Sequence, residues 1–418
     1  MHIKLLTNAE FLEFSKMFKP GSIYQTPYYA FTMHEENYSS MFVGLMDGNI
    51  LKAASLILIY KVNGFKYAIA PRGFLIDYND EALVTTFTKL IKKFLGKKDI
   101  VAIKINPMII KKVYNSSGYA ISNNNLYDTT FNRLKKLGYF HLGYNNYFEA
   151  LKPRFEAYIN LDLDYIKLFG NIDRSCRNKI RKAVRDGIKV YHGNENDLKY
   201  LYEQTKEKYP RGLNYFIDLY KFFGKDNLID FYYSKLDTTD YLQYTQSKYN
   251  EYSRKSNELS HKLISQKGNA DRIVNEKLNV DKMLSKYRNQ LVEATEYLKK
   301  YPEGIVTSSA LVIKWQDEVY LAIDGYDTNY KKFGAKQLMI WKLMGRYAKL
   351  GYKKLHLGGV SNINKPNNKY KGLNEFKLNF HANVIEYIGD FELITNSPLY
   401  FVYKNSFGIT GAFNKTPK

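Results

Sequence analysis

The sequence predicts an α/β (α+β) fold made of two similar α/β units, the second of which is interrupted by a long helical hairpin. Three observations predict this architecture. Apolar, β-rich runs alternate with amphipathic helical segments in both halves of the chain. The phrase Lys-Leu-Gly-Tyr ends a helix and precedes a strand twice, at Lys136–Tyr139 and at Lys349–Tyr352. Between about residues 240 and 300, a heptad pattern replaces this alternation.

The first unit is expected within residues 1–150. Asp47-Gly48 marks a turn between two strands, and Pro71-Arg72-Gly73 ends a third. The expected strands are Met41–Leu45, Ala53–Val62, Lys66–Ala70 and Val101–Ile105, and the expected helices are Glu81–Leu95 and Thr129–Leu137.

The second unit is expected in two parts, residues 151–239 and 303–418. Its expected strands are Ala310–Lys314, Val319–Ile323 and Lys354–Leu357, and its long helix is Gly334–Lys349. The order of elements around this helix matches the order in the first unit, which supports two copies of one α/β unit.

The interruption at residues 240–302 is expected to be an antiparallel coiled-coil hairpin. Residues at 3-4 spacing form one seam on each side of Gly268-Asn269: Leu242, Thr245, Tyr249, Tyr252, Ser256, Leu259 and Leu263, then Ile273, Lys277, Val280, Leu284, Tyr287, Leu291, Ala294 and Leu298. Each arm is expected to be about 40 Å long at ~1.5 Å per residue. An arm of this kind suits a large partner better than a small metabolite.

The composition is that of a large, basic globular protein. The chain has 418 residues, 45% of them hydrophobic, which is enough for two or three domains. Its 63 Lys and Arg residues outnumber its 41 Asp and Glu residues, giving a net charge of +22. This charge favours RNA, DNA, an anionic membrane surface or a phosphorylated substrate as partner, although a basic protein without such a partner has the same composition.

Cysteine usage and hydropathy predict a cytoplasmic protein. The single cysteine excludes a disulfide framework and a cysteine zinc cluster. No apolar run reaches ~18 residues, so no transmembrane helix is expected. The first residues, Met1–Leu5, do not begin the long apolar stretch of a signal peptide.

The strongest cluster of positive charge lies on one predicted helix between Asp173, a suitable N-cap, and Gly187, at the C′ position. Its basic residues are Arg174, Arg177, Lys179, Arg181, Lys182 and Arg185. An apolar stripe of Cys176, Ile180, Ala183 and Val184 adjoins the four arginines. The row is either a solvated helix face or a contact for phosphate or nucleic acid. Cys176 is interpreted as a small buried residue and not as a nucleophile.

Motifs for several enzyme classes are absent from the sequence. It contains no His-Glu-x-x-His, Cys-x-x-Cys, P-loop or Gly-x-Ser-x-Gly motif, and no Gly-x-Gly-x-x-Gly follows a strand. No metal site is therefore predicted. The loop Tyr330–Ala335 precedes a helix whose amides could bind an anion, as the corresponding loop of N-acetyltransferase-like folds binds coenzyme A. Only Gly334-Ala335 remains of the usual loop consensus, which argues against coenzyme A.

Four motifs occur in a characteristic order. They are Pro71-Arg72-Gly73 with Asp77; Arg177-x-Lys179-Ile180-Arg181-Lys182-Ala183 with Gly187-Ile188-x-Val190; Phe333-Gly334-Ala335 with Trp341, Tyr347-Ala348, Gly351-Tyr352 and Gly358-Gly359-Val360-Ser361; and Phe376-Lys377-x-x-Phe380 with Glu386-Tyr387-x-Gly389-Asp390-Phe391. With these motifs and the hairpin, the sequence resembles the Fem family of peptidoglycan bridge-forming aminoacyltransferases from Tyr24 to about Tyr403.

The resemblance implies a fold, a reaction and a set of partners. The fold would be two N-acetyltransferase-like domains, the second carrying the coiled-coil arm. The reaction would transfer an amino acid from aminoacyl-tRNA to the stem peptide of lipid II or of a UDP-linked muropeptide, without coenzyme A, metal or any other cofactor. The enzyme would meet lipid II by peripheral contact with the inner membrane leaflet. Glycine, serine and alanine all remain open as the amino acid, and so does a homodimer.

The resemblance also implies roles for particular residues. Lys377, beside Phe376, would be the catalytic cation, whereas the pattern alone suggests a core strand residue at Phe376 and a surface charge at Lys377. Arg72 follows a strand at a Pro-Gly turn, where it could bind a carboxylate or phosphate. Arg211 and Tyr215, expected one helical turn apart after Pro210, would contact the phosphates of the precursor.

Two departures from the family pattern concern the acceptor. Asn106-Pro107 stands where the family often has Asp-Pro, and because asparagine cannot accept a proton, the existence of a general base there is open. The stretch Tyr28–His34 lacks the lysine that the family tends to have after Gln25-Thr26. Asn106 is nevertheless expected among the substrate-binding residues.

Two other functions remain open at this point. A coenzyme A-dependent N-acyltransferase would use the same fold, although the reduced loop consensus argues against it. A non-catalytic protein that binds tRNA or another RNA would explain the charge and the arm, but it leaves Phe376-Lys377 without a role. Replacing Lys377 by alanine distinguishes these functions. If Lys377 is catalytic, the replacement abolishes activity and leaves tRNA affinity unchanged.

Overall fold

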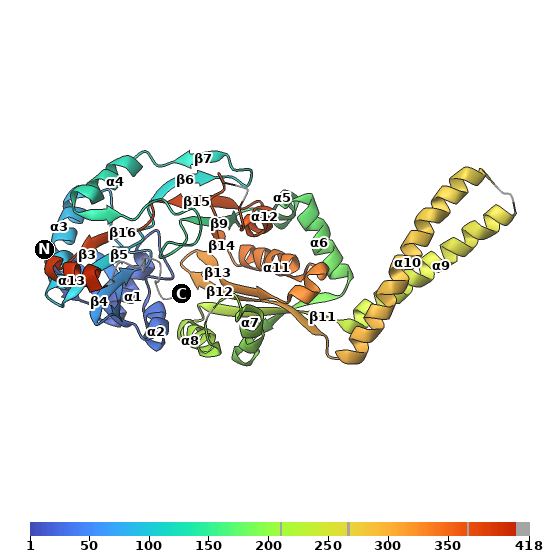
Figure 1. The fold of residues 1–418 in the computed structure, drawn as a ribbon, viewed down its shortest axis with the longest axis horizontal. Helices are drawn as coiled ribbons and strands as arrows, with labels where there is room; N and C mark the ends of the chain where they lie inside the picture. The colour runs from blue at the N-terminus through green and yellow to red at the C-terminus, as the bar shows by residue number, and fades with distance from the viewer. Residues whose placement is uncertain (210, 266–267, 366–367, 407–418) are drawn as a thin grey trace.

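The computed structural model describes residues 1–418 except residue 210 and the segments 266–267, 366–367 and 407–418. Two β-sheets with their covering helices lie side by side along the longest axis, and a helical hairpin projects from one end (Figure 1). The predicted fold class, two α/β units with an inserted hairpin, is confirmed. Among the helices of the described residues, none combines the length and the apolar character needed to span a bilayer.

The first sheet has seven strands in the order β1-β2-β3-β4-β5-β16-β8. In this order they are His2–Leu5, Ser39–Asp47, Ile50–Val62, Phe65–Ala70, Ile100–Ile105, Phe391–Ile394 and Tyr139–His141. The associated helices are α1 (Asn8–Met17), α2 (Pro27–Glu35), α3 (Glu81–Gly96), α4 (Tyr127–Lys136) and α13 (Ser397–Ser406). Helix α3 connects β4 to β5, which pair in parallel.

The second sheet has nine strands in the order β10-β11-β12-β13-β14-β9-β15-β6-β7. In this order they are Ile188–Gly193, Ile229–Leu236, Ile305–Trp315, Glu318–Tyr326, Lys354–Val360, Phe155–Asn160, Asn383–Tyr387, Ile110–Tyr114 and Ala120–Asn123. Its helices are α5 (Tyr165–Asn171), α6 (Arg174–Arg185), α7 (Leu198–Thr205), α8 (Leu213–Gly224), α11 (Ala335–Lys349) and α12 (Lys371–Leu378). Short 3₁₀ helices, η1 (Glu195–Asp197) and η2 (Thr328–Phe333), precede α7 and α11.

The two sheets exchange strands from the ends of the chain. Strands β6 and β7 precede residue 150 but pair in the second sheet, while β16 comes from the C-terminal region and pairs with β5 and β8 in the first. Strands of the range 1–150 therefore contribute to both sheets, and residues 383–394 connect one sheet to the other.

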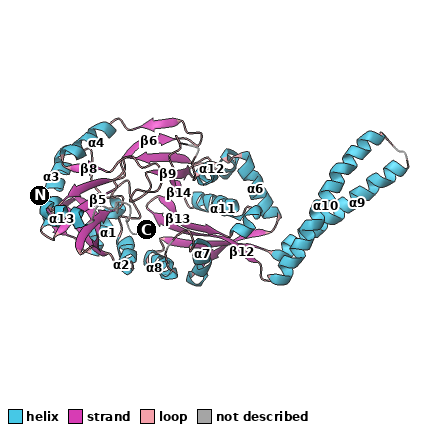
Figure 2. Cartoon of the chain, viewed as in Figure 1, coloured by secondary structure: helices cyan, strands magenta, loops and turns pink. Residues whose placement is uncertain are grey.

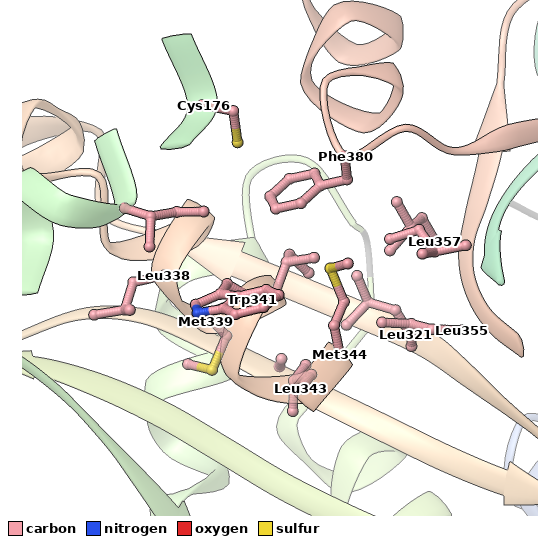
Figure 3. Packing of buried hydrophobic residues seen from close by; sticks show 14 of the residues in the cluster. Cys176, Leu321, Leu338, Met339, Trp341, Leu343, Met344, Leu355, Leu357 and Phe380 are labelled. Atoms are coloured by element: carbon pink, nitrogen blue, oxygen red, sulfur yellow. The ribbon is translucent and has the colours of Figure 1, made fainter. Parts of the chain in front are cut away.

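Helix α11 forms the centre of the second core. Figure 3 shows Leu338, Trp341 and Met344 of this helix among side chains from β13, β14 and the segment after α12. The indole of Trp341 also packs against Tyr165 of α5, with ring centroids 4.4 Å apart. Full burial of each large apolar side chain stabilises the fold by about 1.5–3 kcal/mol. The second unit thus has a rigid core directly behind its loops.

The hairpin consists of α9 (Thr238–Ile264) and α10 (Ala270–Lys300), drawn in cyan at one end of the molecule in Figure 2. Asp237 and Asn269 accept hydrogen bonds from backbone amides and cap the two helices. Every predicted seam position is buried or half-buried, including Tyr252 and Tyr287, whose rings stack at 5.3 Å. The 27 residues of α9 extend over about 40 Å, as predicted.

Candidate active site

A large cavity lies where two parallel strands of the second sheet separate. β13 and β14 pair over three residues only, Glu318–Tyr320 with Lys354–His356. Beyond this point β14 passes Gly358, with φ of +76°, and follows β9, while β13 stays with β12. The space between them is a cavity of about 950 Å³, lined by β13, the start of α11, α12 and parts of α6 and α7.

The start of α11 provides unpaired backbone amides on one side of this cavity. Gly334 adopts a left-handed conformation, with φ of +69°, and no side chain caps the helix. A Cβ atom at Gly334 would lie 2.8 Å from the carbonyl oxygen of Lys179, so α6 packs on this turn too closely for any other residue. Residues 334–337 line the cavity, and although the amide of Gly334 donates to the carbonyl oxygen of Lys331, the amides of residues 335–337 in the first turn of α11 can bind an anion.

Lys377 points into the cavity from α12. Its side chain is only 7% exposed, and its ammonium donates a 2.7 Å hydrogen bond to the carbonyl oxygen of Gly359. Burial lowers the pKa of Lys377 to about 8, while nearby Asp324 acts in the opposite direction. An ammonium group held in this way can stabilise an oxyanion. The alternative of a surface charge at Lys377 is wrong because the side chain is buried, and that of a strand at Phe376 is wrong because the residue lies on α12.

Asp324 and Lys336 form a second charged pair beside Lys377. The ammonium of Lys336, in the first turn of α11, pairs with the carboxylate of Asp324 on β13. It also lies 4.5 Å from the ring centroid of Phe376. Lys336 therefore connects the α11 turn to the Phe376-Lys377 pair. The sequence analysis missed both members of the pair, although Lys336 directly follows the Gly334-Ala335 motif.

Asn374 fixes α12 to the end of β14. Its side-chain oxygen accepts a 3.0 Å hydrogen bond from the amide of Ser361, and its Nδ2 donates to the hydroxyl of the same serine at 2.9 Å. Asn374 and Ser361 are both buried. The position of Lys377 one turn further along α12 is therefore defined by the strand that also forms the cavity wall.

The rim of the cavity is strongly basic. The lysines that line it are Lys179, Lys208, Lys331, Lys332, Lys336 and Lys377, against the carboxylates of Asp324 and Glu375. Cys176 also lines it, but its thiol is buried, and burial raises its pKa to about 12. An excess of lysines over carboxylates favours an anionic ligand. Cys176 has the character of a small core residue, not of a nucleophile.

Most of the basic residues of α6 lie outside the cavity. Asp173 caps the helix through the amide of Ser175 at 2.7 Å, and Gly187 has φ of +88°, both as predicted. The exposed residues of the row are Arg174, Lys179, Arg181 and Arg185, whereas Arg177 and Lys182 are half-buried. The predicted apolar stripe is wrong in one member: Val184 is 57% exposed, because it faces away from the sheet.

Arg72 lies in the contact between the two units. Its guanidinium is 2% exposed and donates through Nη2 to Glu156 Oε1 and to the carbonyl oxygen of Pro153, both at 2.7 Å. It also stacks 4.2 Å from the ring centroid of Tyr387. Its buried Nη1 has no partner among the described residues. Arg72 lines a cavity of about 30 Å³, which shares Leu321, Ala322 and Gly358 with the large one.

Lys152 is a further cation at this contact, and the sequence analysis missed it. Its ammonium lies 3.7 Å from the ring centroid of Tyr24 and 5.3 Å from that of Tyr29. Burial, followed by the charge of Arg72, lowers its pKa to about 7. Nothing in its sequence neighbourhood marks this lysine, since its environment comes from a helix more than a hundred residues earlier.

The other predicted substrate-binding residues lie apart from the catalytic pair. Arg211 pairs with Glu36 and stacks 4.9 Å from the ring centroid of Tyr215. The expectation that they are one helical turn apart is wrong, because α8 begins only at Leu213; Pro210 lies outside the described residues. Asn106 is fully buried and donates through Nδ2 to Asp390 Oδ1 at 2.6 Å. It lines neither the large cavity nor the small cavity beside Arg72.

No candidate metal centre is present in the part of the chain that the structure describes. No group of three or more His, Cys, Asp or Glu side chains there has the arrangement of metal ligands. The polar groups that line the large cavity include lysines, carboxylates and backbone amides.

Known proteins match this sequence along almost the whole chain. The model of the FemAB family matches residues 6–406. Aminoacyltransferase FemA of Staphylococcus epidermidis is 24% identical over 417 residues, covering 96% of this chain and 97% of the relative. The lipid II:glycine glycyltransferase of Staphylococcus haemolyticus is 24% identical over 405 residues, covering 94% and 93%. The crystal structure of FemX has a TM-score of 0.73 at 22% identity, covering 96% of this chain and 99% of that one.

Proposed function

This chain belongs to the FemAB family and is an aminoacyltransferase, and we propose that it transfers an amino acid from aminoacyl-tRNA to the stem peptide or growing bridge of a peptidoglycan precursor. Lipid II is the favoured acceptor and glycine the favoured amino acid, by similarity to a relative named lipid II:glycine glycyltransferase. The observation that carries the proposal is the buried ammonium of Lys377 in a basic cavity opposite the amides of the α11 turn.

The proposed reaction is the aminolysis of an ester. The acceptor amine attacks the ester carbonyl, a C–N bond forms, and the C–O bond to the tRNA ribose breaks. The proton lost by the amine balances the proton gained by the departing ribose oxygen. Lys377 stabilises the oxyanion of the tetrahedral intermediate. With a pKa of about 8 it is mostly protonated at neutral pH, and it can also pass a proton to the leaving oxygen.

The donor is proposed to bind at the basic side of the cavity. The amides of residues 335–337 and the rim lysines Lys179, Lys331 and Lys332 are suited to the phosphates near the aminoacylated end of tRNA. The exposed arginines of α6 and the hairpin lie on the same side of the molecule (Figure 1) and extend this surface. The dimensions of the hairpin suit a partner as large as tRNA.

The acceptor is proposed to enter from the contact between the two units. The small cavity beside Arg72 adjoins the large one, and Lys152 adds an ammonium with no carboxylate of the described residues within ion-pair distance. Nη1 of Arg72 is available to an acceptor, whereas Nη2 is bound to Glu156 and Pro153. Arg211 and Tyr215 lie near Tyr29 and are proposed to contact the phosphates of the precursor.

The test is transfer of a radiolabelled amino acid. Glycyl-, seryl- and alanyl-tRNA are each incubated with lipid II and with the UDP-linked pentapeptide, and label is followed into the precursor by chromatography. We expect transfer from at least one donor, abolished by Lys377→Ala. Binding of tRNA without transfer from any donor would favour an RNA-binding protein. Neither binding nor transfer, together with stabilisation by coenzyme A, would replace the proposal by a coenzyme A-dependent acyltransferase.

A further inference from the structure

A row of lysines on α3 forms a second basic surface, at the opposite end of the molecule from the hairpin (Figure 1). Lys89, Lys92 and Lys93 of α3 and Lys97 at its C-cap follow steps of three, one and four residues, so they lie on one side of the helix, and all four are exposed. No carboxylate of the described residues lies within ion-pair distance of any of them. The acidic residues nearest in sequence stand only at the two ends of the helix.

A shallow hollow joins this row to the start of α13. It has a volume of about 530 Å³ and is lined by the four lysines, Gly96 and residues 395–398. The contact is close, because a Cβ atom at Gly96 would lie 2.6 Å from the carbonyl oxygen of Thr395. The lysine row and the first turn of α13 are therefore parts of one continuous surface.

Helix α13 turns an apolar face outward next to the lysines. Its inner face is held by Leu399 in the core and by Tyr400, which donates to Glu392. Pro398 lines the hollow, and Phe401 and Val402 follow it at three and four residues, so the three share one face. Phe401 is 70% exposed and Val402 is 52% exposed. Both are therefore large apolar side chains exposed to solvent in the described structure.

We propose that the lysine row of α3 and the outer face of α13 form a docking surface for an anionic phospholipid bilayer. Lysines near such a surface are attracted to its negative potential, and apolar side chains beside them can enter the interface. Exposed apolar side chains such as Val402 and Pro398 cannot bind the phosphates of RNA. A bilayer therefore fits this surface better than a nucleic acid does. The inference rests on the proposed function in one respect, that the acceptor is held at a membrane.

The division of labour between the two basic surfaces is part of the inference. The row on α6 adjoins the active-site cavity through Lys179, whereas the row on α3 lies across the first sheet from it. The α3 surface can therefore hold the enzyme at a bilayer while the hairpin end remains free for a soluble partner. Separate binding surfaces of this kind can be disabled one at a time.

The experiment measures cosedimentation of the full-length protein with vesicles. Vesicles of phosphatidylcholine alone are compared with vesicles containing 30% phosphatidylglycerol. We expect binding only to the anionic vesicles, weakening as salt is raised. The triple variant Lys89→Glu, Lys92→Glu, Lys93→Glu should lower the partition coefficient about 100-fold or more, since each lysine contributes about fivefold. Phe401→Ser with Val402→Ser should lower it about tenfold without changing charge.

The matched control reverses three charges on α6, through Arg174→Glu, Lys179→Glu and Arg181→Glu. This variant should keep vesicle binding and lose tRNA binding, while the α3 variant should keep tRNA binding and its melting temperature. Loss of tRNA binding in the α3 variant, with vesicle binding unchanged, would assign the surface to RNA and overturn the proposal. Equal loss of vesicle binding in both variants would reduce it to an effect of net charge.

A transfer assay separates this proposal from the proposed function. With a water-soluble UDP-linked acceptor, or with lipid II in detergent, the α3 variant should be as active as the wild type. Absence of vesicle binding by an enzyme that transfers normally would refute the docking surface alone. Vesicle binding by a protein that transfers nothing would leave the docking surface standing and refute the function.

Discussion

The two units contain the same strand–helix–strand arrangement, but the two parallel strands separate only in the second unit. In the first sheet, β4 and β5 pair in parallel from Lys66 with Ile100 to Ala70 with Ile105, over almost the whole length of both strands and with one irregularity between Lys66 and Ala68. In the second, β13 and β14 separate after three residues. The first unit therefore has a closed sheet at the position where the second has a cavity of about 950 Å³.

The connections after the strands show why the first unit stays closed. After β4 the chain folds back, so that Leu75 pairs with Ala54 of β3 and Phe74 packs on Phe87 of α3 at 4.9 Å. Helix α3 then begins with Asp80, whose side chain accepts from the amide of Leu83, and with Glu81 in its first turn, so this helix end carries negative charge that repels anions. Helix α11 begins instead at Gly334 without a side-chain cap. The parallel strands that separate thus form the candidate active site in the second unit. The parallel strands that stay paired in the first unit form part of its closed sheet.

The largest effect is expected in the cavity where β13 and β14 separate. Lys377→Ala should lower the transfer rate by about 10²–10³-fold, because it removes the only ammonium proposed to stabilise the oxyanion. The measurement is single-turnover transfer, with tRNA affinity and melting temperature recorded in parallel. Retention of activity within tenfold would show that the opening of β13 and β14 does not define the catalytic site. Lys377→Arg is the control that keeps the charge.

In the contact between the two units, Arg72→Met should destabilise the protein while leaving the large cavity intact. It breaks a buried ion pair with Glu156, for which about 3–5 kcal/mol is expected in urea unfolding. The double variant with Glu156→Gln should recover part of this loss, because no unpaired charge remains. If Arg72 instead serves mainly to bind the acceptor, the KM for acceptor will rise with little change in the free energy of unfolding.

The packing of α6 on the α11 turn can be tested with two glycines. Gly334→Ala and Gly351→Ala both place a side chain at positive φ, which costs roughly 1–2 kcal/mol. Only at Gly334 does the new Cβ also meet a backbone oxygen, whereas nothing lies within 4 Å of it at Gly351. We therefore expect a larger loss of unfolding free energy and a weaker affinity for tRNA from Gly334→Ala alone. Equal losses in the two variants would mean that the turn can move without cost.

The smallest effect is expected on the pH profile. Transfer should fall as the pH rises through about 8, because Lys377 then loses the proton that makes it a cation. Asp324 favours the charged form of this lysine, so Asp324→Asn should lower the pKa further and move the falling limb to lower pH. Lys377→Arg should remove the limb. A limb that stays at the same pH in all three enzymes would assign it to another group.

Local pattern was a reliable guide wherever the neighbours in space are also neighbours in sequence. The heptad seam of the hairpin was predicted position by position, because each helix packs against a partner only a short turn away. The caps of α6 were predicted for the same reason. Val184 was placed wrongly, because an amphipathic pattern gives the direction of a buried face but not its width.

Around the site, local pattern was less informative. Phe376-Lys377 and Gly334-Ala335 could be found as motifs, but nothing in the sequence placed Asp324 beside Lys336 or gave Arg72 a partner in Glu156. Asn106 was expected near the acceptor, and its amide proved to be bound to Asp390 more than two hundred residues later. Such contacts depend on which strands are neighbours in the sheets.

The sequence by itself determined the elements: the two α/β units, the hairpin, the basic helix and the family of the chain, because periodicity, turn residues and motifs are local properties. The tertiary structure decided which unit carries the cavity and how its charges are balanced. A lysine becomes a buried cation with a pKa of about 8 only when strands and helices from distant parts of the chain exclude water from it. Lys377 is buried beside the point where β13 and β14 separate, and no local stretch of sequence specifies this position.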